Sequence, residues 1–597
     1  MERTENDCVY VYNTNKRQKL QNELIKNKSC FENLANETIY EIFQYLDVYH
    51  IYEGFFYLNQ RFQNIIVNTN LLIQINVSTM SKSNFELYHK NMIEPNKHRI
   101  NYLRLSNPFT IDIIFFPARI ICDYIQLERL ILDNIDAKYL NSILKHLAFL
   151  PKLDSLVLTP IDYVQDTSIF FISIFSLPKL KSCILTYRTK YDEQPMPIYM
   201  TDFKDSPIEY FLINNRFSIE SLNDIFFCLP KLRYLSIDCL VGCDDPDIDE
   251  DPIVSKYLNN VSIKVDSIDF NLLQKLIKRF FYNTEILHIS TKSDQTYLDA
   301  KQWEELILSS MPNLHTFDIS HDGGTYHDLI NQFNSSFWIK KQWFFTHQHD
   351  SQETLDSGIF YSTNPYRRKT YTFYWQFDQH VCSNMQEKNL NIVKHVHICS
   401  KQIINNYVNY FPNANQLTIE HYFKTSDDSI STTLNCILPL KQLTKLNIKS
   451  SNFPFEQIIK LIYFTPNLHV LKLDFLCLNE IYLKLIEQHE IFRYVSSTNK
   501  ITNIDIREKC TLEIFQLIIY LFPQVEYLKI RINEKEISQI IRFLFSKTTD
   551  KIRRLFFLCI SQIPKVCLRE LNFLIKSENL LSDYSIKYIN RDLYLWW

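Results

Sequence analysis

A short apolar phrase recurs along most of this 597-residue chain at nearly constant spacing. Each copy has two apolar residues three places apart and a third two places later, often with a proline just before it, as in Pro151-Lys-Leu153-Asp-Ser-Leu156-Val-Leu158. Copies of the first series open at residues 100, 127, 153, 180, 208 and 232, which gives steps of 27, 26, 27, 28 and 24 residues. The phrase returns with its second apolar residue at Phe317, Leu417, Leu446, Leu471, Ile504, Leu528 and Leu555. The chain is therefore constrained to fold as a stack of similar units.

Alternation within the phrase places its last two apolar residues on one face of a short strand. The segments between copies have the apolar period of a helix, for example residues 139–150, 271–282 and 513–522. Regular steps in the twenties are typical of leucine-rich repeats. We therefore predict an α/β fold in which a curved leucine-rich-repeat solenoid carries parallel β-strands on its concave face and helices on its convex face. The alternative is an ordinary α/β domain in which the spacing is accidental.

Residues 34–62 have a different, purely helical pattern. Their apolar residues have the spacing of helices with one buried stripe each: Leu34, Ile39, Ile42, Phe43, Leu46, Val48, Ile51, Phe55, Leu58 and Phe62. Asn36 is a suitable cap for the first helix, and Glu37 falls in its first turn, where the helix dipole favours an acid. Three short helices enclose too little interior to bury this whole set. Part of the apolar surface must therefore meet something else.

The same segment resembles an F-box. The residues that match the usual F-box signature are Leu34, Glu37, Ile42, Phe43, Leu46 and the pair Arg61-Phe62. Ala35 replaces the usual proline of that signature, and Phe62 replaces the usual tryptophan. The resemblance, together with the repeats, implies a substrate-recognition adaptor of an SCF-type (cullin-RING) E3 ubiquitin ligase. In that family the F-box binds a Skp-type adaptor, which joins it to the ligase core, and the repeats bind a target protein.

The resemblance also implies which residues contact each partner. The expected adaptor-binding residues are Leu34, Ala35, Ile39, Ile42, Phe43, Leu46 and Ile51. The expected target-binding residues lie between the buried leucines on the concave face: Arg129, Tyr234, Ser236, Asp238, Asp318, Lys445, Lys472, Tyr527, Lys529 and Arg531. Their mixed charges and tyrosines suit a protein or peptide. The protein itself would be no enzyme, because it would contribute only effective concentration and orientation.

Composition narrows the remaining function classes. With only 5 glycines, the chain contains none of the glycine-rich loops with which common nucleotide-dependent enzymes approach a phosphate. A formal net charge of −3 supplies no overall basic field for nucleic acid or an anionic membrane. The 14 cysteines are scattered singly, which favours reduced thiols and a cytoplasmic or nuclear protein. We also expect no signal peptide and no membrane span, because the apolar runs are short.

Three groups of polar residues resemble parts of metal sites. Their members are His347, His349 and Asp350; His395, His397 and Cys399; and the acidic run at residues 243–252. Neither histidine group has a second half at metal-ligand spacing, and Val396 and Ile398 would place the second group on the exposed face of a strand. The acidic run lacks the glycine and spacing of a calcium loop. We therefore predict no metal, no cofactor and no catalytic residue.

The expected domain order follows from these patterns. We predict a disordered tail at residues 1–29, an F-box-like helical module at 30–80, a polar linker at 81–97 and leucine-rich repeats at 98–325. Residues 326–380 lose the phrase and are interpreted as an irregular aromatic insertion, either a β-hairpin or degraded repeats, and residues 381–597 as further repeats with a C-terminal cap. The alternative function is a non-catalytic repeat scaffold without a ubiquitin role, whose helical N-terminus caps the repeats and is buried against them.

Overall fold

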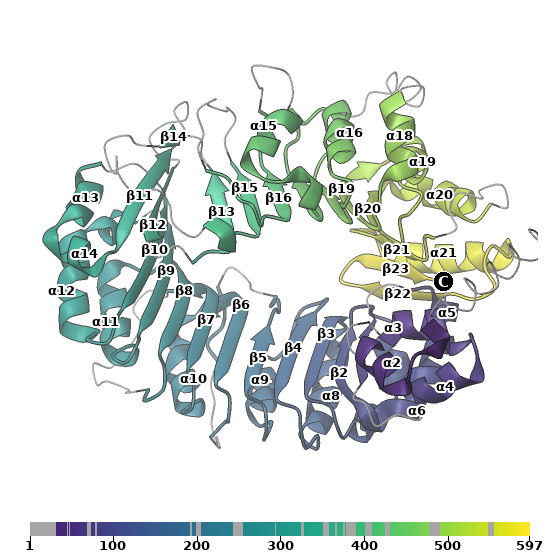
Figure 1. Cartoon of the computed structure of the whole chain (residues 1–597), viewed down its shortest axis with the longest axis horizontal. Coiled ribbons are helices and arrows are strands. Elements are labelled where there is room, and N and C mark those ends of the chain that lie inside the picture. Colours follow the sequence, from purple (N-terminus) through teal and green to yellow (C-terminus); the bar gives the residue numbers. More distant parts are fainter. Residues whose placement is uncertain are drawn as a thin grey trace, which may run out of the picture.

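The structure is a computed structural model that describes residues 31–43, 46, 48–67, 73–77, 80–190, 194–198, 205–242, 255–292, 294–323, 327–349, 358–364, 367–373, 376–377, 390–399, 409–423, 430–476, 490–546 and 554–597. Across these residues, strands alternate with helices and form two long, largely parallel sheets (Figure 1). The strands line the inner side of a curved path, and the helices lie on its outer side. The predicted mixed α/β class is therefore confirmed at this level.

The first sheet has 13 strands and the second has 10. In spatial order the first contains β1 (Ile73–Val77), β2 (Ile100–Leu105), β3 (Arg129–Ile135), β4 (Ser155–Pro160), β5 (Ser182–Leu185), β6 (Tyr210–Ser218), β7 (Tyr234–Val241), β8 (Asn260–Asp266), β9 (Ile286–Lys292), β10 (Thr316–Asp322), β12 (Gly358–Asn364), β11 (Phe344–His349) and β14 (Gln376–Phe377). The second contains β13 (Thr370–Phe373), β15 (His395–Ile398), β16 (Gln416–Ile419), β17 (Lys445–Ile448), β18 (Val470–Leu473), β19 (Asn503–Cys510), β20 (Tyr527–Ile532), β21 (Phe557–Ile560), β23 (Asp592–Trp596) and β22 (Ser585–Ile589).

The α-helices connect successive strands or precede them. They are α2 (Asn36–Phe43), α3 (Val48–Ile51), α4 (Gln60–Val67), α5 (Lys82–Tyr88), α6 (Glu94–Asn96), α7 (Thr110–Ile114), α8 (Leu140–Leu147), α9 (Thr167–Phe175), α10 (Leu222–Cys228), α11 (Phe270–Phe280), α12 (Ala300–Ser310), α13 (His327–Asn331), α14 (Ser336–Lys341), α15 (Ile430–Ile437), α16 (Phe455–Phe464), α18 (Glu490–Thr498), α19 (Leu512–Leu521), α20 (Ile537–Leu544) and α21 (Val566–Ser577). Capped amphipathic segments explain them: in α11 the Asp269 carboxylate accepts from the Leu272 amide at 2.7 Å, and Leu273, Leu276 and Ile277 are buried.

The repeated phrase explains the register of both sheets. Strands of the first series pair so that the second apolar residue of each copy lies opposite that of its neighbour, for example Leu103 with Leu130 and Leu130 with Leu156. The second sheet repeats this pattern, with Leu446 facing Leu471. All five of these side chains are buried. A slip of one residue would turn every one of them to the opposite face, so burial fixes the register.

The repeated phrase was not recognised at β8 and β9 of the first sheet. β8 and β9 place Val261 and Leu287 in the same buried row as Leu235, at steps of 26 residues. The copy in β8 fits the phrase in full, with Leu258, Val261 and Ile263, whereas the copy in β9 opens with the polar Thr284. The last copy was also predicted in the wrong register, because Leu558 and Ile560 of β21, rather than Leu555 and Phe557, pair with Leu528 and Ile530 of β20.

The aromatic segment at residues 326–380 separates the two sheets. β11 and β12 form an antiparallel hairpin, and β12 also pairs antiparallel with β10, which ends the parallel series. β13, predicted as part of the insertion, instead begins the second sheet by pairing parallel with β15. Gln348 joins the sheets, because its amide donates to the hydroxyls of Tyr361 at 2.6 Å and Tyr371 at 2.7 Å.

Residues 81–97 are not the polar linker that the sequence predicted. They form α5, a π-helical segment (His89–Ile93) and α6, and they bury Phe85, Tyr88, Met92 and Ile93. The sequence prediction missed these helices because polar residues separate the four apolar ones in the sequence. The strand β1, predicted within the helical module, pairs parallel with β2 and is part of the first sheet. The first sheet therefore starts before residue 98.

The C-terminus packs against the N-terminal part of the chain, so the curved path closes into a ring (Figure 1). Trp596 carries this contact. Its side chain is fully buried, its ring centroid lies 5.6 Å from those of both Phe85 and Phe109, and its Nε1 donates to the Met80 carbonyl oxygen at 2.8 Å. The predicted C-terminal cap thus meets the start of the first sheet as well as covering β21.

Polar contacts join the same two ends. The Lys587 ammonium donates to the Pro108 carbonyl oxygen at 2.7 Å and lies 2.6 Å from an Asp112 carboxylate oxygen. The Lys82 amide donates to the Trp597 carbonyl oxygen at 3.0 Å. Because no described strand of one end pairs with a strand of the other, side chains and this single backbone bond close the ring. No helix among the described residues is long and apolar enough to cross a membrane.

Candidate protein-interaction surfaces

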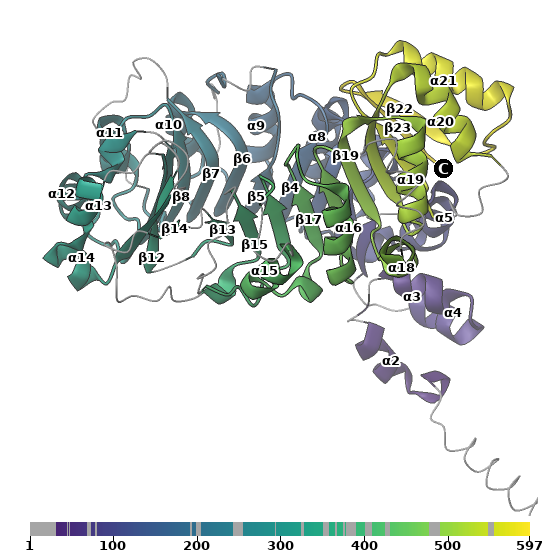
Figure 2. The same cartoon turned by 90° about the horizontal axis from the view of Figure 1, so that it is seen from above.

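The N-terminal helices form a small module with its own core. α2 lies well away from the sheets, as Figure 2 shows. Ile39 is fully buried inside the module, and the rings of Phe31, Phe55 and Phe62 pack on one another with centroids 5.2 to 5.9 Å apart. These contacts occur between residues of the module itself. The module therefore keeps its shape with little help from the sheets on this side.

Arg61 fixes the start of α2. Its guanidinium donates to the carbonyl oxygens of Glu32 and Leu34, the second at 2.6 Å, and to Asn36 Oδ1 at 2.7 Å. Asn36 was predicted as the cap of this helix, but α2 begins at Asn36 and its side chain binds Arg61 instead. Glu37 lies in the first turn, as predicted. Arg61, from the last helix of the module, thus fixes the backbone before the first helix.

The expected adaptor-binding residues fall into three groups by exposure. Ile39, Phe43 and Ile51 are buried within the chain, and Leu34 and Ile42 are half-buried. Ala35 and Leu46 are exposed, and Leu46 shows 41% of its surface. The first group supports the module from within, because a side chain without exposed surface has none to offer a partner. Leu34, Ala35, Ile42 and Leu46 are accessible.

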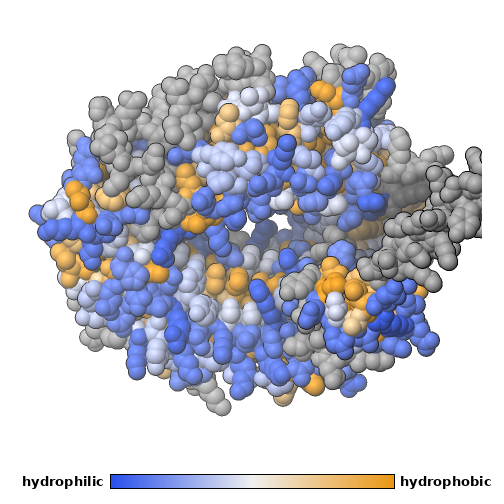
Figure 3. All heavy atoms as spheres, in the orientation of Figure 1, coloured by the Kyte–Doolittle hydropathy of each residue, from blue (hydrophilic) through white to orange (hydrophobic). Residues whose placement is uncertain are grey.

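The sequence analysis assigned no contact role to two further exposed apolar residues of the module. Tyr57 and Leu58 expose 68% and 55% of their surfaces. In the space-filling view, apolar residues gather over this part of the molecule (Figure 3). Isolated apolar side chains on a surface need no explanation, but several in one small module indicate an interaction site. The sequence showed that the module has more apolar residues than it can bury, but it did not show which of them are exposed.

The opposite side of the module is attached to the body. Tyr49 and Tyr52 pack against Tyr88, with ring centroids 5.5 and 5.3 Å away. The Asn91 amide donates to the Tyr52 hydroxyl at 2.9 Å. Burial, followed by the neighbouring Tyr57, raises the pKa of Tyr52 to about 12, so its hydroxyl stays neutral at physiological pH. One side of the module is thus anchored while α2 projects.

The inner face of the first sheet carries an apolar row that was not predicted. Ile131, Val157, Ile184 and Leu212 are partners in register on β3 to β6. They lie between the buried ladder residues and so point to the other side of the sheet. In four successive copies of the phrase the last three residues are all apolar, as in Leu130-Ile131-Leu132. This triplet could have predicted the apolar row. The row gives the inner face a hydrophobic stripe.

Nine of the ten predicted target-binding residues remain partly exposed on inner strands. On the first sheet these are Arg129, Tyr234, Ser236 and Asp238, and on the second Lys445, Lys472, Tyr527, Lys529 and Arg531. Some are already paired within the chain: Lys529 lies 2.9 Å from the Asp592 carboxylate, and Lys472 lies 3.7 Å from that of Asp505. Tyr527 stacks on Phe557 with centroids 5.0 Å apart.

Asp318 differs from the other nine because it is buried. Its carboxylate accepts from the Arg368 guanidinium at 2.8 Å and lies 3.0 Å from His288 Nδ1. Burial alone would raise the pKa of Asp318, but Arg368 and then His288 outweigh it and hold this pKa at about 2. Asp318 is therefore a structural anion rather than an exposed contact residue. The segment that carries Arg368, about 50 residues further along the chain, covers it.

A polar cavity lies where the two ends of the chain meet. Its volume is about 420 Å³, and its lining includes Asn134, Thr159 and Asn214 from the first sheet with Lys529 and Asp592 from the second. Because both ends contribute to its lining, the cavity depends on ring closure.

No family model matches this chain, and no curated protein matches its sequence.

Proposed function

We propose that the protein is a substrate-recognition adaptor of an SCF-type ubiquitin ligase. In this proposal the helices α2 to α4, predicted within residues 30–80, form an F-box-like module that binds a Skp-type adaptor. The two sheets, which include β1, are a leucine-rich-repeat solenoid that binds a target. The observation that supports it most is the projection of α2 from a module that exposes Leu46 and Leu58. Its anchored side would hold the adaptor at a fixed position relative to the inner face.

The inner face provides the chemistry for a protein target. The apolar row would take apolar side chains of a target segment at Val157, Ile184 and Leu212, which are partly exposed, whereas Ile131 is buried. Lysines on the facing sheet, among them Lys445, would take acidic groups. Interfaces that combine an apolar centre with charged surroundings are typical of specific protein contacts. The protein would then bring its target to a ligase without acting on it covalently.

The experiment measures binding of a purified Skp-type adaptor to the full chain and to the double variant Leu46→Asp with Leu58→Asp. Each leucine contributes about 1.5–3 kcal/mol when fully buried. The two charges should therefore weaken binding by at least about a hundredfold. Both residues are exposed, so the fold should survive, whereas an aspartate at the buried Ile39 would unfold the module.

Leu308→Asp is the matched control, because Leu308 exposes 64% of its surface on the distant helix α12. This variant should bind the adaptor as tightly as the original chain. Equal binding by the double variant and the control would contradict the proposed role of the module. Absence of adaptor binding by the unaltered chain would favour the second candidate function.

The second candidate is a repeat scaffold without a ubiquitin role, in which the helical module only caps the first sheet. The packing of Tyr49 and Tyr52 against Tyr88 favours it, because a cap must be attached in this way. The exposure of Leu46 and Leu58 favours the adaptor function, because a cap should bury its apolar side chains. The adaptor-binding experiment separates the two.

A further inference from the structure

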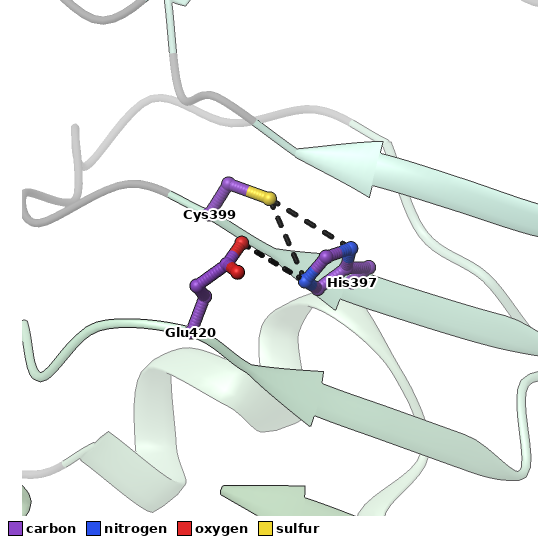
Figure 4. A group of neighbouring side chains, drawn as sticks. All are labelled: His397, Cys399 and Glu420. Atoms are coloured by element: carbon purple, nitrogen blue, oxygen red, sulfur yellow. Dashed lines mark hydrogen bonds and ion pairs between the residues drawn. The ribbon is translucent and has the colours of Figure 1, made fainter. Parts of the chain in front are cut away.

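The repeat register brings three potential metal ligands together on the second sheet. His397 is an inner residue of β15, Cys399 follows the end of that strand, and Glu420 follows the end of β16 (Figure 4). Ile398 faces Ile419 across these strands, so the next residues, Cys399 and Glu420, occupy equivalent positions. Among the described residues, these three side chains place a nitrogen, a sulfur and an oxygen within 4.8 Å of one another.

The distances between the ligand atoms match a tetrahedral zinc site. His397 Nε2 lies 3.6 Å from Cys399 Sγ and 3.2 Å from Glu420 Oε2. Zinc binds thiolate sulfur at about 2.3 Å and imidazole nitrogen or carboxylate oxygen at about 2.0–2.2 Å. In a tetrahedron with those radii, nitrogen and sulfur are about 3.6 Å apart and nitrogen and oxygen about 3.4 Å apart. Both distances from His397 Nε2 therefore fit a shared metal ion, and the third pair, Cys399 Sγ and the Glu420 oxygen, lies within 4.8 Å.

The surroundings orient the carboxylate and favour a cation. The Lys449 ammonium lies 3.5 Å from Glu420 Oε1, which leaves Oε2 for the side facing His397. The imidazole of His397 lies between the thiol and the carboxylate, so its Nε2 is directed toward the position that a metal would occupy. Asp322, which lies on β10 of the other sheet, adds a negative charge that acts on both His397 and Cys399.

We propose that His397, Cys399 and Glu420 bind a zinc ion through the imidazole nitrogen, the thiolate sulfur and the carboxylate oxygen, with water at the fourth position. The mixed donor set selects zinc over the hard cations, because a thiolate is a poor ligand for magnesium or calcium. Binding releases the thiol proton to solvent and changes no oxidation state. The proposed site is independent of the adaptor function and is an alternative to the prediction that the chain has no metal site.

The simplest alternative is a hydrogen-bonded polar cluster that binds no metal. Neutral His397, the thiol of Cys399 and the carboxylate of Glu420 could satisfy one another in that way at the observed distances. Sulfur coordination distinguishes the two, because only a metal site produces thiolate-to-metal charge transfer.

The test titrates Co²⁺ and then Zn²⁺ into the full chain after removal of metal with a chelator. We expect one Co²⁺ per chain, visible absorption of tetrahedral cobalt and a near-ultraviolet charge-transfer band, all displaced by one equivalent of Zn²⁺. Cys399→Ser should lose the charge-transfer band and bind Zn²⁺ at least ten times more weakly in competition with a chromophoric chelator. Cys436→Ser, which removes the exposed cysteine of α15, is the matched control and should leave both unchanged.

A second measurement keeps the proposal testable if Cys399→Ser fails to fold. Zn²⁺ should protect Cys399 of the unaltered chain from alkylation by iodoacetamide, mapped by mass spectrometry, and should leave Cys436 reactive. Glu420→Gln should retain the charge-transfer band but weaken Zn²⁺ binding at least tenfold. A missing band in the unaltered chain, a band that persists in Cys399→Ser, or equal alkylation of Cys399 with and without Zn²⁺ would each overturn the proposal.

Discussion

Replacing Trp596 by alanine should open the ring. The side chain is fully buried between Phe85 and Phe109, and its Nε1 donates to the Met80 carbonyl oxygen. Truncating a buried tryptophan to alanine costs about 3–5 kcal/mol, and that range includes much of the lost aromatic packing. The lost hydrogen bond is worth about 1 kcal/mol. We therefore expect closure to weaken by about 4 kcal/mol.

Hydrogen exchange at the closing contact measures this loss directly. The Lys82 amide donates to the Trp597 carbonyl oxygen, so its exchange reports whether the two ends are together. Where exchange follows local opening, 4 kcal/mol corresponds to a rate increase of about a thousandfold. Small-angle X-ray scattering should show a larger radius of gyration for Trp596→Ala than for the original chain.

Trp303→Ala is the control for general loss of stability. Trp303 is also fully buried, but it packs against Phe270 and Phe317 in the middle of the first sheet. That variant should unfold at lower denaturant concentration while the exchange rate at Lys82 stays near its original value. Unchanged exchange at Lys82 in Trp596→Ala, or an equal increase in both variants, would refute the assigned role of Trp596.

Three further predictions concern other parts of the molecule. The folded state holds the pKa of Asp318 at about 2, against an ordinary value of 3.8. Its ionised form therefore contributes about 2 kcal/mol of stability above pH 4, and this contribution is lost as the pH falls toward 2. Denaturant midpoints measured across this pH range should show that Asp318→Asn lacks the loss, and a pH profile identical to that of the original chain would contradict the prediction. Ile184→Asp should reduce capture of the target at least tenfold in affinity purification, whereas Ile169→Asp on the outer helix α9 should not, and equal capture would remove the apolar row from the binding surface. Gln348→Ala should destabilise the chain by about 1–3 kcal/mol in chemical denaturation, because it removes the donor shared by two buried tyrosine hydroxyls, which also lie 2.9 Å from each other. An unchanged denaturant midpoint would show that the contact between the two hydroxyls is sufficient.

Local pattern was sufficient to predict the strand ladder. Residues such as Leu130 and Leu156 alternate, stand at repeat spacing and are buried, so one physical rule determines their place. Val261 and Leu287 obey the same rule and were missed, although both stand 26 residues after the preceding copy.

The proposed zinc site was missed for a different reason. His397 and Cys399 were examined along a single strand, and a search along one strand cannot find a ligand on the next. Glu420 lies 21 residues after Cys399 and becomes its neighbour only through the pairing of Ile398 with Ile419. Superimposing successive copies of the phrase would have aligned the two residues. Ring closure by Trp596 had no comparable signal, because it depends on the curvature summed over the whole chain.

The closed ring has a consequence for how such a chain can change in length. An open array of similar units gains or loses a unit at little cost, because each unit contacts only its neighbours. Here an added or deleted unit would rotate one end relative to the other and draw Lys587 away from Asp112. The number of units is therefore fixed by geometry. Insertions should be tolerated in the loops between units, and duplication of a whole unit should not.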